Sequence, residues 1–342
     1  MIHESSVPFI SNNAPALVLA PMEGVTDLPM RALMTERGGF SFCVSEFVRI
    51  SQDVPSVRSF RENIPELQTG ARTAAGTPVQ VQLLGGDPGK LADSAVNAHL
   101  AGAAAIDLNF GCPAPLVNKH DGGACLLRHP DRIHSIVSRV RSALPKHVPL
   151  SAKLRLGWES VEDIHENAYQ AARAGASWIT IHARTKAQGY RPPVYWKHIG
   201  EVRNHLAIPV VANGDIWAAE DLMRCYEETG CIHFMLGRGA MANPSLPMQG
   251  DFFLKNETKE NKYNAFINSP GEWLPLLERF SELCGPLTKN PNYVACRIKQ
   301  WLSMASYKNQ IEWVSPLKRA SNLSEIFSLL REMSAVHGGE IA

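Results

Sequence analysis

Residues 104–115 read AAIDLNFGCPAP, an apolar run that is broken by glycine, cysteine and proline. Such a run is typical of a buried strand, and a Gly-Cys-Pro sequence ends a strand in a turn. The pattern therefore predicts a strand over 105–109, with the thiol of Cys112 just beyond its carboxyl end. A free cysteine is more often buried and inert than reactive, so the rest of the chain decides whether Cys112 is a reagent.

The same alternation of a short apolar run and an amphipathic segment extends over residues 16–245. It predicts further strands at 17–21, 42–47, 79–85, 150–157, 178–184, 209–215 and 232–239. Nearly continuous apolar runs are typical of parallel strands covered on both faces, and a helix is predicted over 161–175. Eight strand–helix units in roughly 225 residues favour an α/β fold, the (β/α)8 TIM barrel. A doubly wound open sheet would need a glycine-rich turn after its first strand, and APMEGVTD (20–27) is not one.

The segments outside the barrel differ in composition. Residues 1–15 form an N-terminal extension to which the sequence assigns no role. Residues 246–269 are polar and interrupted by glycine and proline, which indicates a linker. Residues 270–342 have helical periodicity throughout, and we interpret them as a small helical domain.

Composition excludes several classes of protein. The 342 residues contain no uninterrupted apolar run of membrane-spanning length, and the first residues lack the regions of a secretory signal. The seven cysteines are scattered without a Cys-x-x-Cys pair, which argues against a disulfide framework and a zinc site. The sequence therefore predicts a cytoplasmic protein with no metal and no membrane partner. A net charge of +1 leaves any nucleic-acid contact to a local basic surface.

Polar side chains gather at the predicted carboxyl ends of the strands, which in a barrel meet at one mouth and carry the chemistry. Any one of them is as readily explained as a group that caps a loop, but nearly every strand contributes. They are Glu23, Glu46, Gln82, Asn109, Cys112, Lys153, Arg155, His182, Arg184, Asn213, Asp215 and Arg238.

The loops after the last two strands indicate a phosphate site. Asn213-Gly214 follows one strand and Gly237-Arg238-Gly239 follows the other. Glycines there allow backbone N–H groups to approach an anion closely, although a plain tight turn is the alternative. A phosphate-bearing cofactor above Lys153 and His182 suggests a flavin, because a lysine stabilises the negative charge of the reduced ring.

Seven blocks of the sequence, in this order, resemble the signature blocks of the tRNA-dihydrouridine synthases: APMEGVTD, VQLLGG, DLNFGCPAPLVNKHDGGACLL, KLRLGW, IHARTKAQGYR, ANGDI and GRGAM. The resemblance covers residues 17–241. SEFVRI (45–50) and VACRIKQWLSM (294–304) are similar to the bacterial C subfamily, the tRNA-dihydrouridine(16) synthases. The resemblance implies an enzyme that uses FMN and NADPH to reduce one uridine in the D-loop of tRNA to dihydrouridine.

The resemblance also implies a role for individual positions. Cys112 is then the general acid, and Asn109 orients the uracil. FMN is bound by Pro21, Met22, Glu23, Gln82, Lys153, His182, Asn213, Gly214, Asp215, Gly237 and Arg238. Transfer RNA is contacted by Arg49, Tyr190, Arg297, Lys299 and Trp301. The sequence departs from the family pattern at Ala114-Pro115, Ala183 and Asp215, and no catalytic group is lost.

The chemistry of uracil reduction explains why a thiol suits this place. A flavin supplies the hydride to C6, and the proton for C5 comes from an acid that is protonated at neutral pH. A thiol, whose reference pKa is about 8.5, meets this need. Cys125, which follows Gly122-Gly123 in the same loop region, is the rival candidate.

An RNA substrate requires a positive surface and aromatic groups that hold an extruded base. Residues 286–320 carry six cations against the single acid Glu312, with aromatic side chains interleaved, and Arg184 in RTKAQGYR is a candidate phosphate contact. A solvated helix face with buried aromatics is the alternative interpretation. The competing functions are a flavin-dependent ene reductase or dehydrogenase of a small molecule, and an RNA-binding protein with an inactive barrel. We expect a monomer.

Overall fold

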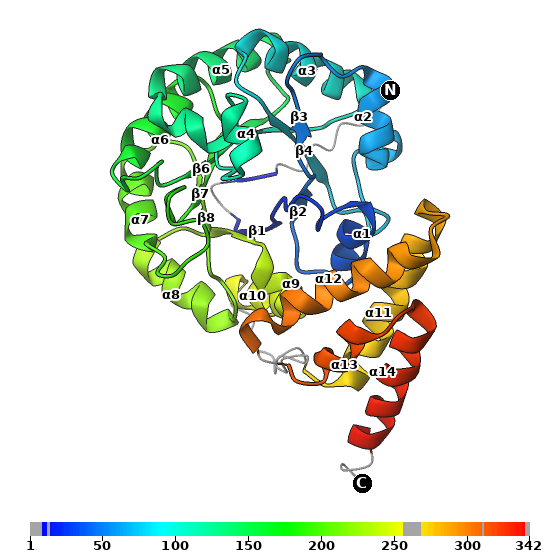
Figure 1. The fold of residues 1–342 in the computed structure, drawn as a ribbon. Helices are drawn as coiled ribbons and strands as arrows, with labels where there is room; N and C mark the ends of the chain where they lie inside the picture. Colours follow the sequence, from blue (N-terminus) through cyan, green and yellow to red (C-terminus); the bar gives the residue numbers. More distant parts are fainter. Residues whose placement is uncertain (1–8, 12–13, 256–267, 310, 339–342) are drawn as a thin grey trace.

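The computed structural model describes residues 9–11, 14–255, 268–309 and 311–338, and its centre is a closed barrel of parallel strands (Figure 1). Around the ring the strands are β2 (Phe42–Val44), β1 (Ala16–Leu19), β9 (His233–Leu236), β8 (Val210–Asn213), β7 (Trp178–His182), β6 (Leu150–Arg155), β5 (Ile106–Asn109) and β4 (Val79–Leu84). Because β2 also pairs with β4, the ring is closed. The predicted (β/α)8 barrel and its eight strands are confirmed.

Most strands end before the predicted boundary, and the residues left over form the loops at the mouth. The predicted strand 42–47 divides into β2 and a short β3 (Val48–Arg49), which pairs with the end of β4. The division falls where the Ser45 hydroxyl, in place of a backbone carbonyl, accepts a hydrogen bond from the Gln82 N–H (3.1 Å).

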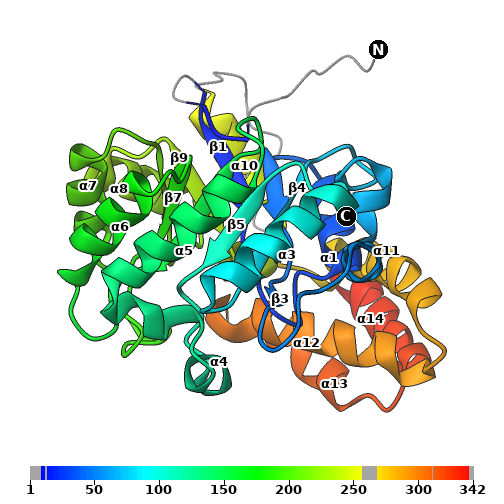
Figure 2. The same ribbon diagram turned by 90° about the horizontal axis from the view of Figure 1, so that it is seen from above.

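Helices cover the outside of the ring (Figure 1). In chain order these helices are α1 (Leu28–Glu36), α2 (Val57–Asn63), α3 (Pro88–Ala101), α5 (Pro130–Ala143), α6 (Asp163–Arg173), α7 (Trp196–His205), α8 (Ala219–Thr229) and α9 (Arg238–Ala242). The short helix α4 (Pro115–Lys119) instead projects from one end of the barrel (Figure 2). The buried residues of α6, Ile164, Ala168 and Ala171, recur at helical spacing, so that one face of the helix packs on the barrel. The helix ends before Gly175, whose φ of 103° lies outside the right-handed helical region.

Aromatic side chains close the barrel at the amino ends of its strands. Phe42 opens β2 and Trp178 opens β7, and their ring centroids lie 6.1 Å apart. Phe9, from the N-terminal extension, contacts both, with its centroid 5.1 Å from that of Phe42 and 6.4 Å from that of Trp178. Phe9 and Ile10 therefore pack against the end of the barrel opposite the mouth, a contact that the sequence did not indicate.

The C-terminal helices are α11 (Pro270–Cys284), α12 (Pro291–Asn309), α13 (Val314–Arg319) and α14 (Leu323–Gly338). They pack around Trp273, Phe280 and Trp301, whose rings meet edge to face. In both ribbon views α12 lies against the barrel, and in Figure 2 it lies at the same end as α4. Arg279 of α11 forms an ion pair with Glu36 of α1 (2.8 Å), which joins the helical part to the barrel.

The predicted linker 246–269 is corrected in its first part, because α10 (Leu246–Leu254) is a helix. Its Gly250 lies so close to β1 that a Cβ atom there would stand 3.0 Å from the Leu17 side chain. The glycine that suggested a flexible segment thus permits close packing instead. Residues 256–267 lie outside the described part of the chain. Among the described helices, none has the length and apolar character needed to cross a membrane.

Candidate active site

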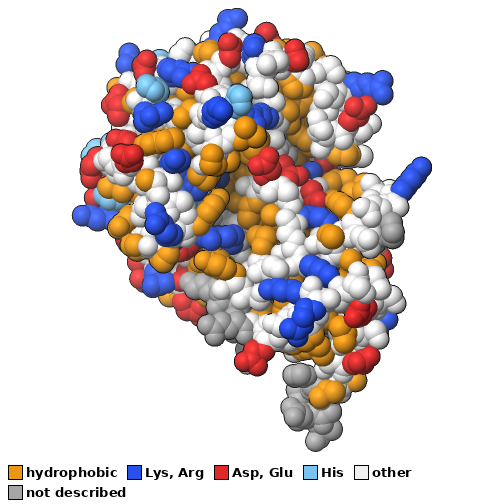
Figure 3. Space-filling model, in the orientation of Figure 1, with side chains coloured by type: hydrophobic (Ala, Val, Ile, Leu, Met, Phe, Trp, Pro, Cys, Tyr) orange, Lys and Arg blue, Asp and Glu red, His pale blue; other side chains and the backbone are white. Residues whose placement is uncertain are grey.

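A cavity of about 580 Å³ opens at the carboxyl ends of the strands. This volume is within the ordinary range for a small-molecule or cofactor site. Figure 3 shows this face of the molecule hollowed near its centre, with hydrophobic and Lys or Arg side chains around the hollow. Predicted site residues that line the cavity are Pro21, Met22, Glu23, Asn109, Cys112, Lys153, His182, Tyr190, Asn213, Gly214, Asp215, Gly237 and Arg238.

A chain of hydrogen bonds inside the barrel leads to the Cys112 loop. The Asp107 carboxylate accepts hydrogen bonds from the Gln82 amide nitrogen (2.7 Å) and from the Ser151 hydroxyl. The Gln82 carbonyl oxygen accepts from Asn109 Nδ2 (2.9 Å). Asn109 Oδ1 in turn accepts the backbone N–H groups of residues 111 and 112, both at 2.9 Å. The backbone at Cys112 is therefore held by Asn109 at the cavity wall, and Asn109 is held by Gln82 and Asp107 behind it.

The Cys112 thiol is half-buried, and burial raises its pKa above the ordinary value. It is consequently protonated at neutral pH, as a general acid must be. Cys125, the rival, is buried and donates to the Gly122 carbonyl (3.2 Å), and it is not among the residues that line the cavity. The geometry favours Cys112 over Cys125.

Lys153 and His182 form the polar floor of the cavity. Burial lowers the pKa of Lys153 to about 8, and its ammonium group lies 3.3 Å from Asn213 Oδ1. Burial also lowers the pKa of His182 well below its ordinary value, and the cations around it act in the same direction, so this imidazole is neutral. His182 Nδ1 is buried and has no hydrogen-bond partner among the described residues. The His182 residue lines the cavity, so its neutral imidazole is available to a ligand there.

The loops after β8 and β9 face each other across one side of the cavity. Gly214 has a φ of 120°, which only glycine adopts readily. A Cβ atom at Gly237 would stand 3.4 Å from both Ala20 and Met22, so this glycine keeps the cavity wall open. Asp215, between the two loops, pairs with Arg184 (2.5 Å) and with Arg238 (3.1 Å).

Arg155 joins the two loops that border the mouth. Its guanidinium donates to the Gly111 carbonyl (2.8 Å), next to Cys112, and to the Gly189 carbonyl (2.8 Å), next to Tyr190. The Tyr190 ring, 52% exposed, stands over this group and over Arg238 at 5.2 and 4.8 Å. Arg155 therefore holds an exposed aromatic ring beside the candidate general acid.

The profile of the dihydrouridine synthase (Dus) family matches residues 18–332. That match spans nearly the whole chain. This chain belongs to the dihydrouridine synthase family. It is 42% identical over 324 residues to the tRNA-dihydrouridine(16) synthase of Neisseria meningitidis serogroup B, with 93% of this chain and 96% of that protein covered. The protein of that name from Pseudomonas putida is 41% identical over 319 residues, with 92% and 96% covered.

A third relative, the tRNA-dihydrouridine(16) synthase of Vibrio parahaemolyticus, is 48% identical over 231 residues, or 67% of this chain and 72% of that protein. The family recognised from the seven sequence blocks is thereby confirmed.

Two residues predicted to contact ligands of this dihydrouridine synthase lie inside the barrel. Gln82 does not line the cavity, because its amide is held between Asp107 and Asn109. Arg184 has a fully buried side chain paired with Asp215, so it does not reach an RNA phosphate. The sequence placed Arg184 at the end of the predicted strand 178–184 and made it a candidate phosphate contact, but its side chain is fully buried.

The predicted RNA contacts on α12 are corrected in the same way. Trp301 is 1% exposed, and its indole N–H donates to the Met241 carbonyl (3.0 Å). Arg297 is buried and donates to the carbonyls of Gly24 (2.6 Å) and Val25 (3.0 Å) in the loop after β1. Helical periodicity alone did not tell which face of α12 meets the barrel, and this face does.

Lys299 and Arg49 keep partial exposure. Lys299 donates to the Ala320 carbonyl at the end of α13. Arg49 donates to the Leu116 carbonyl (3.1 Å) on α4, beside the Cys112 loop. Sequence reasoning missed two further participants, the buried Asp107 and the cavity-lining Met304 of α12. Asp107 stood in the quoted strand two residues before Asn109, and that shared inward face was the available signal.

Proposed function

We propose that this dihydrouridine synthase reduces the C5–C6 bond of uridine 16 in the D-loop of tRNA, with FMN as cofactor and NADPH as reductant. One observation carries the proposal: the protonated Cys112 thiol shares a single cavity with Asn109, Lys153 and His182. The choice of position 16 is supported by the names of the relatives from Neisseria, Pseudomonas and Vibrio. We expect a cytoplasmic monomer.

The residues of the cavity fit FMN. The neutral imidazole of His182 and the buried cation of Lys153 would meet polar atoms of FMN, while Pro21 and Met22 offer an apolar wall. Gly214, Gly237 and Arg238 would hold the phosphate, since the first N–H groups of a helix lack partners within it. When bound, FMN supplies hydride transfer, which no side chain can perform.

The chain's own residues then hold and protonate the base. The Asn109 amide donates one hydrogen bond to Gln82 and accepts two from the backbone N–H groups of residues 111 and 112. These bonds fix its orientation, so a uracil can be positioned against it. Cys112 delivers its proton to C5, on the same side of the cavity. Lys153, charged below its pKa of about 8, stabilises negative charge at the cavity floor.

A tRNA base must leave its stack before it can enter this cavity. Tyr190 is the exposed aromatic group at the mouth, where a ring can stack on an extruded base. Arg49, which donates to the Leu116 carbonyl on α4, is a further predicted cation beside the Cys112 loop. The buried Arg184, Arg297 and Trp301 are excluded from direct RNA contact in this proposal.

The test is a position-mapped assay for dihydrouridine on unmodified tRNA with purified protein, FMN and NADPH. Reduction confined to position 16 is the expected result. Reduction at another D-loop uridine would keep the chemistry and refute the choice of position. A flavin-containing protein that leaves tRNA unchanged but is oxidised by small enones would instead support the ene reductase alternative.

A further inference from the structure

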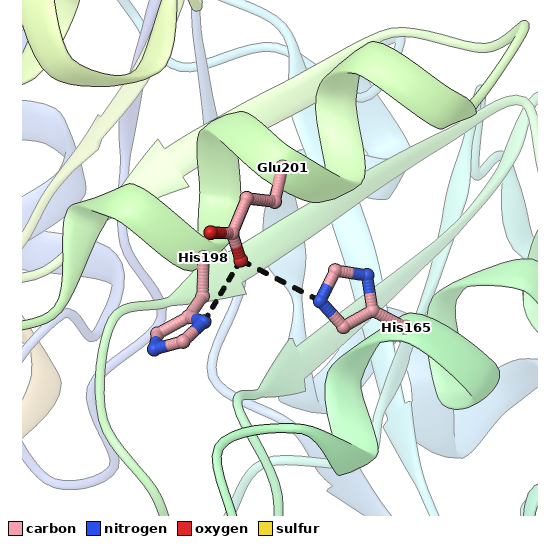
Figure 4. A group of neighbouring side chains, drawn as sticks. All are labelled: His165, His198 and Glu201. Atoms are coloured by element: carbon pink, nitrogen blue, oxygen red, sulfur yellow. Dashed lines mark hydrogen bonds and ion pairs between the residues drawn. The ribbon is translucent and has the colours of Figure 1, made fainter.

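Three side chains from neighbouring helices converge on the outer wall of the barrel. His198 and Glu201 lie on one face of α7, and His165 reaches across from α6 (Figure 4). His198 Nδ1 stands 3.0 Å from Glu201 Oε2, and His165 Nε2 stands 3.6 Å from the same oxygen. All three potential ligand atoms lie within 4.8 Å of one another. None of these residues lines the cavity of the candidate active site.

This donor set has the composition and spacing of a zinc site. Two imidazole nitrogens and one carboxylate oxygen are typical ligands of Zn²⁺, with bonds of about 2.0–2.2 Å. A tetrahedron with such bonds has edges of about 3.3–3.6 Å; the two nitrogen–oxygen distances here are 3.0 and 3.6 Å, and the two imidazole nitrogens lie within 4.8 Å of each other. Mg²⁺ and Ca²⁺ prefer oxygen ligands alone, and thiolate-seeking ions find no cysteine in the cluster.

We propose that His165, His198 and Glu201 bind one Zn²⁺ ion, with water in the fourth position. The sequence predicted no metal because its cysteines form no Cys-x-x-Cys pair, and this site exists only once α6 and α7 are side by side. The competing explanation is a set of ion pairs between protonated histidines and the carboxylate. Other charged groups near the cluster are Glu162, 4.0 Å from His165, and Lys197, 3.6 Å from Glu201.

The position of the zinc site links it to the loops at the mouth of the barrel. His165 lies in the first turn of α6 and His198 in the first turn of α7. The loops that lead into these turns border the cavity and pair with each other, through Lys186 N–H to the Gly157 carbonyl (2.8 Å) and Ala187 N–H to the Trp158 carbonyl (2.9 Å). An ion that joins the two helix starts therefore holds together the loop that follows Arg155 and the loop that carries Tyr190.

The test is zinc titration of the full-length protein after removal of metal with EDTA and exhaustive dialysis. We expect one Zn²⁺ per chain by calorimetry, and a rise in Tm with Zn²⁺ but not with Mg²⁺. The variants His198→Gln and Glu201→Gln should each weaken binding by at least about tenfold. His205→Gln, an exposed histidine on the same helix, is the matched control and should bind zinc as the wild type does.

Two spectroscopic readouts separate this site from adventitious binding. Co²⁺ in place of Zn²⁺ should give visible d–d bands without a thiolate charge-transfer band, since no cysteine is a ligand. Hydrogen exchange over residues 157–165 and 184–198 should slow on addition of Zn²⁺ in the wild type and not in His198→Gln. Absence of binding at about 100 μM Zn²⁺, equal binding by all variants, or a thiolate band would each overturn the proposal.

Discussion

Asp107 sets the direction of the hydrogen-bond chain that ends at Cys112. A carboxylate is an acceptor only, so the Gln82 amide must turn its NH2 group toward it. The Gln82 oxygen then faces Asn109 Nδ2, and Asn109 is left with its oxygen toward the N–H groups of residues 111 and 112. The amides of Gln82 and Asn109 therefore each have one orientation, because the Asp107 carboxylate can only accept hydrogen bonds.

Replacement of Asp107 by leucine removes the acceptor and leaves the Gln82 NH2 group unpaired. A buried donor without a partner costs about 1–3 kcal/mol. If that cost falls on the position of the Cys112 loop, turnover falls by about 5- to 150-fold. Asp107→Asn should lose less, because the asparagine oxygen can still serve Gln82 when its NH2 group faces Ser151. We therefore expect wild type, asparagine and leucine to form a graded series.

The assay is the single-turnover rate of dihydrouridine formation with saturating FMN and tRNA, together with FMN affinity and Tm. Ser151→Ala is the matched control, since it removes the other donor to Asp107 and leaves the carboxylate and the chain to Cys112 in place. Its turnover should stay close to that of the wild type. A folded Asp107→Leu protein that turns over as fast as Ser151→Ala would refute the reasoning.

Three further predictions concern the cavity and its support. Cys112→Ala should leave FMN bound and lower turnover by about 10²- to 10⁴-fold, as measured by product formation; unchanged turnover would remove the thiol from the mechanism. FMN affinity should fall as pH rises through about 8, because Lys153 loses its charge there, and flavin fluorescence titrations of Lys153→Met should lack this step. If both proteins show the same pH dependence, another group is responsible. Arg297→Ala should lower stability by about 2–3 kcal/mol through loss of its pair with Asp27 (2.8 Å), seen as a lower Tm, with an unaltered salt slope for tRNA binding. A flatter salt slope with an unchanged Tm would return Arg297 to the RNA surface.

The barrel and its mouth were predictable because both follow from repetition along the chain. Parallel strands put their carboxyl ends on one edge, so polar residues such as Asn109, Lys153 and His182 had to meet. The orientation of individual side chains depends on tertiary packing that the sequence does not display. Asp107 lies between the apolar residues Ile106 and Leu108, so the sequence alone does not show that its carboxylate is buried inside the barrel.

The helical domain shows the same division. Its helices were predictable from the helical periodicity of the sequence. The same periodicity is compatible with Arg297 and Trp301 facing either RNA or the barrel. The packing of α12 on the barrel determines which face is buried. Trp301 donates to the Met241 carbonyl, and Arg297 donates to the Gly24 carbonyl in the loop after β1. The early part of the predicted linker failed for a related reason, because Gly250 serves contact and not flexibility.

The contact of α12 with the loop after β1 bears on how proteins of this family diverge. Arg297 holds the carbonyls of Gly24 and Val25, and Met304 supplies part of the cavity wall. In a chimera whose helical domain comes from another family member, the side chains that contact residues 21–25 would therefore also come from that other protein. Substitutions in α12 that retarget the enzyme to another uridine should be inherited together with compensating changes in that loop, so the two segments are expected to evolve as one unit despite lying at opposite ends of the chain.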